Sequence, residues 1–584
     1  MPDWSDVPLL YQAQIEGRCQ LHRQENKQKA QAYDWVDQWT KLYHSTDDSG
    51  GRSGQPDKTP KSQQRPSPVK KNNLSEPPQF SGEAKTRPYT MTWRLVTNGG
   101  QDDGIIRPAI GARGYPYYPG SSMKGAFRRA CACTTEQALK YCGKPSEGDQ
   151  GSEPGILRFL GGYPTDNNWT KNLVDIAHPQ QKKQVIQDEK TNANVLLSFH
   201  EVTLNFGISS TIPLDEQEWR TIWQIWEKAL GNGLGSRVSA GYGRFKDVPS
   251  PETLLQVHLK GQGIAATLLD KKTPEFRPNM FKAALRGHTL RLLGGMTDEK
   301  TAKHLTQILW GGIDGAAILG QLGISFTYED GDLKFDKHRY TPPGQREQIM
   351  PLYNLEKGIL QISCMNPCAS PEERQELAEL AKAIVQFSLL LGGFGKSWRR
   401  ADHWQFFHPY FKKGNKPMIG CHWEFIDSSE SLYLPITDLQ QDLSRFIDRL
   451  RIRFQNYAAK QGYTIHPDNP VHCNWREAWY PYDNQGGVQV WGRIVEDRIK
   501  AITWFHQPYE GTHTLRNLQG SIGRDSQTGR LWHRIYPYYH LNSEGKLQRQ
   551  KPPIELLTFF PEPTEDSAHF IAFLNERSDF VKIW

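Results

Sequence analysis

The chain has 584 residues, of which 37% are hydrophobic and 11% aromatic, and its 71 lysines and arginines exceed its 64 aspartates and glutamates by seven. This length suits three or four domains with real cores, and the small charge excess means that any nucleic-acid role depends on local basic patches rather than on global charge. The start lacks a basic segment followed by an apolar core, no run of 18 apolar residues occurs, and the eight cysteines are scattered, so we expect a cytoplasmic protein without membrane spans or a disulfide framework.

The N-terminal part of the chain changes character once. Spaced apolar and aromatic residues among Gln, Lys and Glu predict a helical segment over residues 1–45. Residues 46–88 are rich in Ser, Gly, Pro, Gln and Lys and hold almost no large apolar side chain, which predicts a flexible, disordered linker. The first folded module is therefore expected to begin at residue 89.

Residues 89–250 are predicted to form one α+β module. Its elements follow in the order strand, loop, helix, strands, helix, strand, which is ferredoxin-like. Along the chain they are the strand 89–96, the loop 98–104, a helix start capped by Ser121 or Ser122, the strand 202–207, the helix 216–230 and the strand 242–248. Alternating polarity, turn residues, a capping serine and tryptophans at 3.6-residue spacing support these assignments.

Residues 251–427 repeat this pattern, beginning with a predicted strand at 254–259. Ser370-Pro371-Glu372-Glu373 is a capping box with proline at the first helical position, and the helix that it opens is predicted to end at Gly392. The spacing also repeats, because Lys124 precedes Gly231 by 107 residues and Lys282 precedes Gly392 by 110. The two halves are therefore predicted to be structural duplicates.

The last part of the chain, residues 428–584, has no confident fold assignment. It contains a third basic glycine segment at 515–524, followed by an aromatic run at 530–536. We expect a C-terminal extension that either completes the second module or forms a further module of the same kind.

Two glycine-rich basic loops follow the two predicted helices, at 231–245 and 391–400. Glycines let backbone N–H groups approach an anion closely, and Arg and Lys side chains add positive charge, a combination that suits the phosphates of a nucleic acid. The helix starts near Lys124 and Lys282 supply further N–H groups and cations. The residues predicted to bind RNA are Ser121, Ser122, Lys124, Arg128, Arg129, Gly233, Gly235, Ser236, Arg237, Tyr242, Arg244, Lys282, Arg286, Gly393, Gly395, Lys396, Arg399 and Arg400.

A resemblance to the RAMP superfamily of CRISPR-associated proteins rests on three motifs in the first module: Pro119-Gly120-Ser121-Ser122-Met123-Lys124-Gly125-Ala126-Phe127-Arg128, Gly233-Leu234-Gly235-Ser236-Arg237 and Gly241-Tyr242-Gly243-Arg244-Phe245. In the second module it is weaker, because Arg277-Pro278-Asn279-Met280 stands in place of Pro-Gly-Ser-Ser and the loop ends in Trp398-Arg399-Arg400 without Gly-Tyr-Gly.

This resemblance implies tandem ferredoxin-like, RRM-like modules that hold guide RNA in antiviral defence. The expected partners are guide RNA, target RNA, the large polymerase-like subunit and the neighbouring RAMP subunits of a type III effector complex. A two-module backbone or capping subunit of such a complex fits the sequence.

The resemblance also raises the question of target cleavage. Backbone subunits of this superfamily that cut RNA carry an aspartate in the loop after the first strand, where Asp102 and Asp103 stand, and Asp270 holds the equivalent place in the second module. A carboxylate there could bind Mg²⁺ or another divalent ion, or align the ribose 2′-OH for attack on the next phosphate. Capping subunits often lack this activity and Asp-Gly is a common turn, so a purely structural RNA-binding subunit stays an alternative.

Two further chemistries stay open. Cys131, Cys133 and Cys142 cluster behind the helix start, but Cys-x-Cys with one distant cysteine matches zinc ligation only in part, so buried thiols are favoured over zinc. A guide-RNA processing endonuclease would need histidine as general acid or base. The histidines in or near basic segments are His403, His408, His513 and His533.

Overall fold

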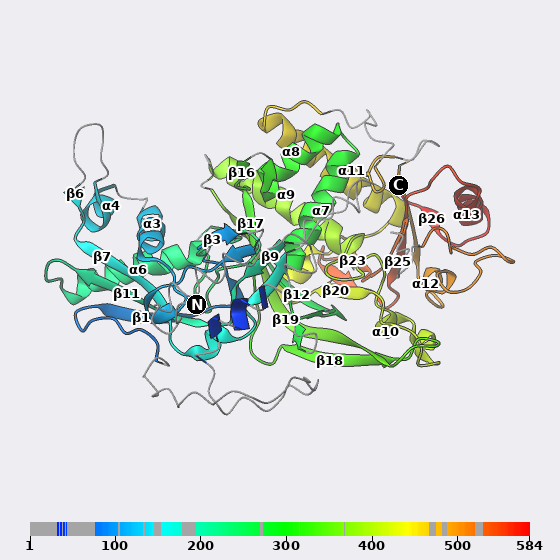
Figure 1. Cartoon of the computed structure of the whole chain (residues 1–584). Helices are drawn as coiled ribbons and strands as arrows, with labels where there is room; N and C mark the ends of the chain where they lie inside the picture. The colour runs from blue at the N-terminus through cyan, green and yellow to red at the C-terminus, as the bar shows by residue number, and fades with distance from the viewer. Residues whose placement is uncertain are drawn as a thin grey trace, which may run out of the picture. The chain divides into compact units, whose positions relative to one another are not determined.

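The computed structural model describes residues 32–33, 35–37, 39–40, 43, 76–97, 99–102, 105–131, 135–144, 153–177, 194–250, 252–268, 273–314, 316–366, 368, 370–465, 475–481, 487–519 and 529–584. These residues form a mixed α+β structure with small antiparallel sheets, divided into two compact units (Figure 1). The first unit ends at Pro251, and the second runs from Glu252 to Trp584 and also takes in Ser239–Gly241. No helix in the described ranges combines the length and apolar character that a bilayer span requires.

The first unit is built on a three-stranded antiparallel sheet with the order β7-β11-β1. Its strands and helices are β1 (Lys85–Thr90), α3 (Gly120–Ala130), β7 (Leu157–Pro164), β11 (Thr203–Ser210) and α6 (Glu216–Asn232). Phe206 of β11 lies 5.0 Å from Trp226 of α6 between ring centroids, so α6 covers this sheet through an aromatic contact.

Helix α6 contains the predicted helix 216–230 and continues for two further residues. Asp215 caps it, since its Oδ1 accepts a hydrogen bond from the Glu218 N–H at 2.7 Å. Trp219, Trp223 and Trp226 are all buried on its inner side. The 3.6-residue spacing of the tryptophans thus marks the face that packs on the sheet.

Helix α3 begins at Gly120, before the predicted serine caps, and no side chain caps it. The serine-cap prediction is therefore wrong. A Cβ atom at Gly120 would lie 2.1 Å from the carbonyl oxygen of Phe159 in β7, so the helix starts where its backbone touches the sheet. Only glycine permits that contact.

The predicted last strand of this module, 242–248, is reduced to a single bridge. Met91 pairs with Phe245 in antiparallel fashion, next to the end of β1. A longer strand cannot form because Gly241, Gly243 and Asp247 have φ values of 88°, 64° and 59°, which turn the backbone out of the extended conformation.

The remaining parts of the first unit are short. They are β2 (Arg94–Leu95) paired with β10 (Phe199–His200), the sheet of β3 (Gly100–Asp102), β4 (Ile105–Arg107), β9 (Asn194–Leu197) and β8 (Val174–Ala177), the pair β5 (Gly143–Lys144) and β6 (Glu153–Pro154), α4 (Thr135–Cys142), and the 3₁₀ turns η3 (Ala112–Gly114) and η4 (Asn167–Thr170). The predicted strand 89–96 is thus split between β1 and β2, the predicted loop 98–104 contains β3, and β1 begins inside the predicted linker.

The described residues between 32 and 40 are helical and pack on the first unit. The Trp39 indole N–H donates to the Gly114 carbonyl at 2.8 Å, and its ring lies 4.8 Å from that of Trp169. Tyr43 donates to the Arg113 carbonyl at 2.5 Å. This N-terminal segment is therefore part of the first unit's aromatic core.

The second unit contains a five-stranded antiparallel sheet in which β17-β19-β12-β20 are neighbours and β18 pairs with β19. Its elements are β12 (Thr253–Ile264), α7 (Asn279–Gly294), α8 (Glu299–Trp310), β17 (Leu322–Thr327), β18 (Leu333–Tyr340), β19 (Gln348–Cys364), α9 (Pro371–Leu390), α10 (His403–Phe406), η5 (His408–Phe411), β20 (Cys421–Phe425) and η6 (Asp427–Leu432). The capping box is confirmed, because Ser370 Oγ accepts from the Glu373 N–H at 3.2 Å.

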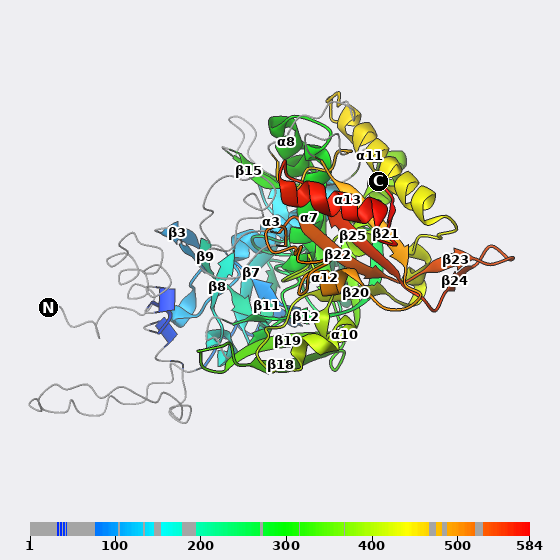
Figure 2. The same ribbon diagram turned by 90° about the vertical axis from the view of Figure 1, so that its right-hand side faces the viewer.

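Residues 428–584 contribute a four-stranded sheet with the order β22-β25-β21-β26. The elements of this part are α11 (Leu439–Lys460), β21 (Gln489–Ile494), α12 (Ala501–Trp504), β22 (Leu531–Tyr536), β23 (Tyr539–Leu541), β24 (Leu547–Arg549), β25 (Ile554–Phe559), α13 (Glu565–Glu576) and β26 (Val581–Lys582). Figure 2 shows α13 lying across this sheet, where Phe570 is 5.5 Å from Phe559. Three short strand pairs complete the unit: β13 (Ala266–Thr267) with β14 (Pro274–Glu275), β15 (Gly312–Asp314) with β16 (Ala316–Ile318), and β23 with β24.

The two larger sheets of the second unit share one strand order. With β18 left out, each sheet has four strands, which we number first to fourth along the chain. In space these strands lie in the order second, third, first, fourth. The sheet of the first unit has the same order over its three strands. One continuous core joins residues 252–427 to residues 428–584: Phe387 of α9, for example, lies 4.7 Å from Trp479.

Candidate nucleic-acid interface

The exposed side of α3 presents positive charge to solvent. Met123 and Phe127 are buried toward the sheet, which leaves Ser121, Ser122, Lys124 and Arg129 exposed on the other side. Its first turn contains no acidic residue. Uncapped N–H groups at a helix start carry partial positive charge, so this end of α3 suits a phosphate.

Arg128 has a different environment from these exposed residues. It is half-buried, and its Nη1 donates to the Gly143 carbonyl at 3.2 Å. This contact holds the residue against the strand pair of β5 and β6.

The glycine loop after α6 has a constrained backbone. Gly233, Gly235 and Arg237 have φ values of 87°, 76° and 61°, and a Cβ at Gly235 would lie 2.2 Å from the Val96 carbonyl oxygen. The Ser236 N–H donates to that same carbonyl at 2.9 Å, and the Gly233 N–H donates within α6. Because these N–H groups bind the unit's own backbone, the positive charge that the loop offers comes chiefly from the exposed Arg237 side chain.

Tyr118 joins the glycine loop to α3. Tyr118 is 4% exposed, and its hydroxyl lies near enough to the Gly235 backbone and to Arg129 for both to act on its pKa. Burial raises the pKa of Tyr118 to about 12, although Arg129 and the Gly235 N–H both oppose the rise. The cation at the end of α3 therefore lies beside the glycine loop, and two separate stretches of sequence form one basic site.

Two residues predicted to bind RNA lie in the interior instead. Tyr242 is 1% exposed, and its hydroxyl donates to Asp175 Oδ2 at 2.8 Å. Arg244 is 7% exposed and donates from Nη1 to the Gly231 carbonyl at 2.6 Å; burial lowers its pKa to about 10. Both side chains fix the conformation of the glycine loop, and neither is presented to a ligand in this structure.

Of the three aspartates proposed for cleavage, the structure describes only Asp102. Asp102 is the last residue of β3, where its backbone pairs with Ile105 of β4, so it stands at the end of a hairpin. Asp103 and Asp270 lie outside the described residues.

The second glycine loop repeats the backbone of the first. Gly395 and Ser397 have φ values of 90° and 58°, and they match Gly235 and Arg237, which are also two residues apart. The two loops thus share an unusual left-handed conformation at corresponding positions. In the second copy, however, the left-handed residue carries no charge.

The cations near the second loop are bound within the second unit. Lys282 is 6% exposed and donates to Ser239 Oγ at 2.5 Å, and Lys396 donates to the Ala265 carbonyl at 3.1 Å. Arg286 points to the Gly311 carbonyl at 3.4 Å, and a Cβ at the buried Gly393 would lie 2.3 Å from Arg534. This loop therefore presents less free charge than the first one.

Arg399 and Arg400 connect the second loop to the C-terminal sheet. Arg399 makes a two-pronged ion pair with Glu477, at 2.8 and 2.9 Å, and its guanidinium lies 4.5 Å from the Trp398 ring centroid. Arg400 lies 3.9 Å from the ring centroid of Phe505, and burial lowers its pKa to about 9. Both arginines were predicted to contact RNA, and in the structure they stabilise the unit instead.

The cysteines and histidines give little support to a metal or nuclease site. Burial raises the pKa of Cys131 to about 12 and also raises that of Cys142, which favours neutral thiols; Cys133 is not among the described residues. Within the described ranges no group of three or more His, Cys, Asp and Glu side chains could hold a metal ion.

Of the four histidines singled out in the sequence, two are buried. His533 pairs with Glu555 at 3.0 Å, and His403 lies 2.9 Å from His506 between their Nε2 atoms. Burial lowers the pKa of His403 to about 3. His408 and His513 are exposed.

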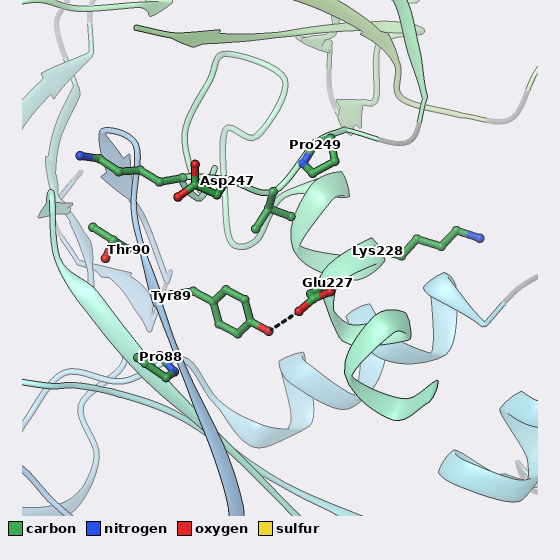
Figure 3. A pocket seen from close by; sticks show the side chains of 9 residues that line it. Pro88, Tyr89, Thr90, Glu227, Lys228, Asp247 and Pro249 are labelled. Atoms are coloured by element: carbon green, nitrogen blue, oxygen red, sulfur yellow. Dashed lines mark hydrogen bonds between the residues drawn. The ribbon is translucent and has the colours of Figure 1, made fainter. Parts of the chain in front are cut away.

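The structure also shows an open pocket of about 630 Å³ in the first unit. Its lining includes Tyr89 of β1 and Glu227 of α6, which are joined by a hydrogen bond of 3.1 Å (Figure 3). Lys228 and Lys246 bring cations to its rim. Sequence reasoning missed this pocket, because its lining comes from three separated segments.

Comparison with known proteins finds a family match within the first unit. A family model described as "RAMP superfamily" matches residues 99–246. Among solved structures, the chain is similar to one from a "Type IV-B CRISPR Complex", with 15% identity and a TM-score of 0.19 over 27% of this chain and 86% of that one. Another, from "Cryo-EM structure of the Type III-B Cmr-beta bound to cognate target RNA", has 9% identity and a TM-score of 0.31 over 55% and 98%.

No curated protein matches the sequence. The matched range 99–246 contains α3, its exposed cations and the whole glycine loop, that is, every part of the basic site built above. Over residues 99–246, the chain matches the model of the RAMP superfamily.

Proposed function

We propose that this chain is an RNA-binding subunit of a CRISPR effector ribonucleoprotein and that its first unit holds guide RNA. The observation that carries the proposal is the basic site made by the exposed cations of α3 and of the glycine loop, which both lie near Tyr118. Lys124, Arg129 and Arg237 are exposed there and make no ion pair with any residue that the structure describes. Such cations contact phosphates of any sequence, which is what holding a variable guide requires.

The strand orders support a modular architecture for this role. Second, third, first, fourth is the spatial order of a ferredoxin-like sheet, and it recurs in the two larger sheets of the second unit. We infer ferredoxin-like modules in tandem, with residues 428–584 supplying a third one. The first module combines the exposed Arg237 of its glycine loop with the exposed Lys124 and Arg129 of α3, whereas the exposed Lys396 of the second loop donates to the Ala265 carbonyl, so we assign guide binding to the first module.

The test is charge reversal at the basic site. The variant Lys124→Glu/Arg129→Glu/Arg237→Glu should bind a short unstructured RNA more weakly than the parent. Because single-stranded RNA gives a salt slope of about 0.7 per phosphate contact, losing three contacts should reduce the slope of log K against log salt by about 2. A matched control, Lys144→Glu/Lys171→Glu/Arg220→Glu, reverses three exposed cations elsewhere in the unit and should keep more of the affinity. Equal affinities and slopes for the two variants would refute the assignment.

Target cleavage is a second, separate proposal, favoured by the position of Asp102 at the end of the β3–β4 hairpin within the family match. Asp102→Ala and Asp103→Ala should each be compared with the parent in the assembled complex with Mg²⁺ present. The loss of one or more target RNA fragments, with guide binding unchanged, is the expected result. An unchanged fragment pattern in both variants would leave a purely structural subunit.

A further inference from the structure

A second surface with RNA-like chemistry lies in the second unit, where the segment that follows the glycine loop meets a β-hairpin. The hairpin of β18 and β19 ends beside α10 and η5, as Figure 1 shows. His338 Nε2 lies 2.8 Å from the Lys416 carbonyl oxygen, and the Thr341 N–H donates to the Gly414 carbonyl at 3.0 Å. The two segments are therefore one continuous surface. We call it the aromatic–lysine platform and define it by His338, Tyr340, Trp404, Phe411, Lys412 and Lys413.

The rings of the platform are packed on each other but remain accessible. Trp404 is 50% exposed, and its ring lies 5.4 Å from Phe411 and 6.2 Å from His338. His338 in turn stacks on Tyr340 at 5.8 Å, with 13° between the ring planes. Neighbouring rings thus hold Trp404 in place while leaving much of it open to solvent. An exposed tryptophan on a supported surface is a feature of binding sites.

The charge of the platform is strongly positive. Segments 333–349 and 402–416 contain seven lysines and arginines against three acidic residues. Lys334 and Arg339 are paired with Glu356 and Glu347, at 2.8 and 3.1 Å, and Asp402 is 1% exposed, which leaves five cations against Asp336. Lys412 and Lys413 are exposed and form no ion pair within the described part of the chain. Lys416 lies 5.9 Å from the ring centroid of Tyr410.

This combination distinguishes RNA from a protein partner. Protein interfaces are rich in aromatic residues but depleted in lysine, whereas surfaces that bind single strands place cations beside stacking rings. We propose that the aromatic–lysine platform binds single-stranded RNA, with an unpaired base stacked on Trp404 and its flanking phosphates at Lys412 and Lys413. This site is distinct from the basic site of the first unit.

The experiment uses the full chain and a fluorescein-labelled, unstructured oligonucleotide of alternating adenosine and cytidine, with binding followed by fluorescence anisotropy. Losing one base stack should weaken binding by about 5- to 150-fold in Trp404→Ala, whereas Trp404→Phe keeps a ring and should bind nearly as the parent does. Lys412→Glu/Lys413→Glu/Lys416→Glu should lower the salt slope by about 2. The control Lys300→Glu/Lys551→Glu/Lys582→Glu reverses exposed lysines outside the platform and should change the slope less.

A second readout does not depend on affinity. RNA carrying 4-thiouridine should crosslink on irradiation to the peptide that contains Trp404, and the lysine variant should lose this crosslink. If the platform variants bind and crosslink as the parent does while charge reversal in the first unit weakens binding, the platform proposal is overturned and the surface belongs to a protein partner. If only the platform variants weaken binding, the platform proposal holds and the assignment of guide binding to the first unit fails.

Discussion

Replacing Glu477 by glutamine should destabilise the second unit more than any single surface change. Glu477 is fully buried between Arg291, whose Nε lies 2.6 Å from Oε2, and Arg399, which binds both carboxylate oxygens. The substitution keeps the size of the side chain but leaves two guanidinium groups without a counter-charge. Arg291 is itself 0% exposed, so its charge cannot turn to water.

The magnitude follows from the burial of this cluster. Removing one partner of a buried ion pair costs about 3–5 kcal/mol. A unit of about 330 residues has an unfolding entropy of about 0.7 kcal/mol/K, so this loss corresponds to a fall in Tm of about 4–7 °C. The control Glu356→Gln breaks the pair between Lys334 and Glu356, two exposed residues 2.8 Å apart, and should not shift the Tm measurably.

Scanning calorimetry at neutral and acidic pH provides the assay. Burial alone would raise the pKa of Glu477, but Arg399 and Arg291 outweigh it and lower the pKa from 4.5 to about 2. The stability that this shift contributes is present above pH 4.5 and is lost as the pH falls toward 2. The deficit of Glu477→Gln should therefore shrink over that range. A Tm within about 1 °C of the parent at neutral pH would refute this account of the cluster.

Two further predictions use scanning calorimetry, and the second also uses the anisotropy assay. Burial raises the pKa of Asp402 from 3.8 to about 6, so the stability that it contributes is complete below pH 3.8 and is lost as the pH rises through 6. Asp402→Asn keeps the helix cap and cannot ionise, so its Tm relative to the parent should rise between pH 4 and 6; a constant difference would contradict the shift. Arg237→Gly should leave the free energy of unfolding of the first unit within about 1 kcal/mol of the parent, because the φ of 61° favours glycine. The same variant should lose RNA affinity in the anisotropy assay, and unchanged affinity would exclude Arg237 from the basic site.

Local sequence signals predicted the helices well. Ser370 caps α9 where the pattern places it, because a cap is decided by residues three or four positions apart. The spacing of the tryptophans identified the buried face of α6 for the same reason. The sequence also showed the repeated glycine loops, and in the structure Arg237 and Ser397 share a left-handed φ within them.

Which arginines face solvent could not be predicted, because their partners are distant in sequence. From the sequence, Arg399 and Arg400 were predicted to be cations of an RNA-binding loop. In the structure Arg399 pairs with Glu477, and Arg400 lies over the ring of Phe505. Tyr242 and Arg244 belong to a family-like motif, but the turns at Gly241 and Gly243 direct their side chains inward. A glycine-rich basic motif therefore indicates a tight turn, and only the fold decides whether its charges are available.

The C-terminal sheet went unrecognised because its basic glycine segment lies between the first and second strands rather than after the second helix. A long insertion also separates β21 from β22 in the sequence. It interrupts the regular spacing of strands and turns by which a sheet is identified from sequence. Its strand order became visible only from the pairing of β25 with β21 and β22.

The core shared by residues 252–427 and 428–584 has a practical consequence for dividing this protein. Trp398 packs 4.9 Å from Trp532 and Phe387 packs against Trp479, so a fragment that stopped at residue 427 would carry bare aromatic surface and invite aggregation. The same contacts mean that insertions or deletions which shift the tail relative to the central sheet would be penalised throughout the unit. Residues 252–584 should therefore be expressed, exchanged and inherited as one indivisible block.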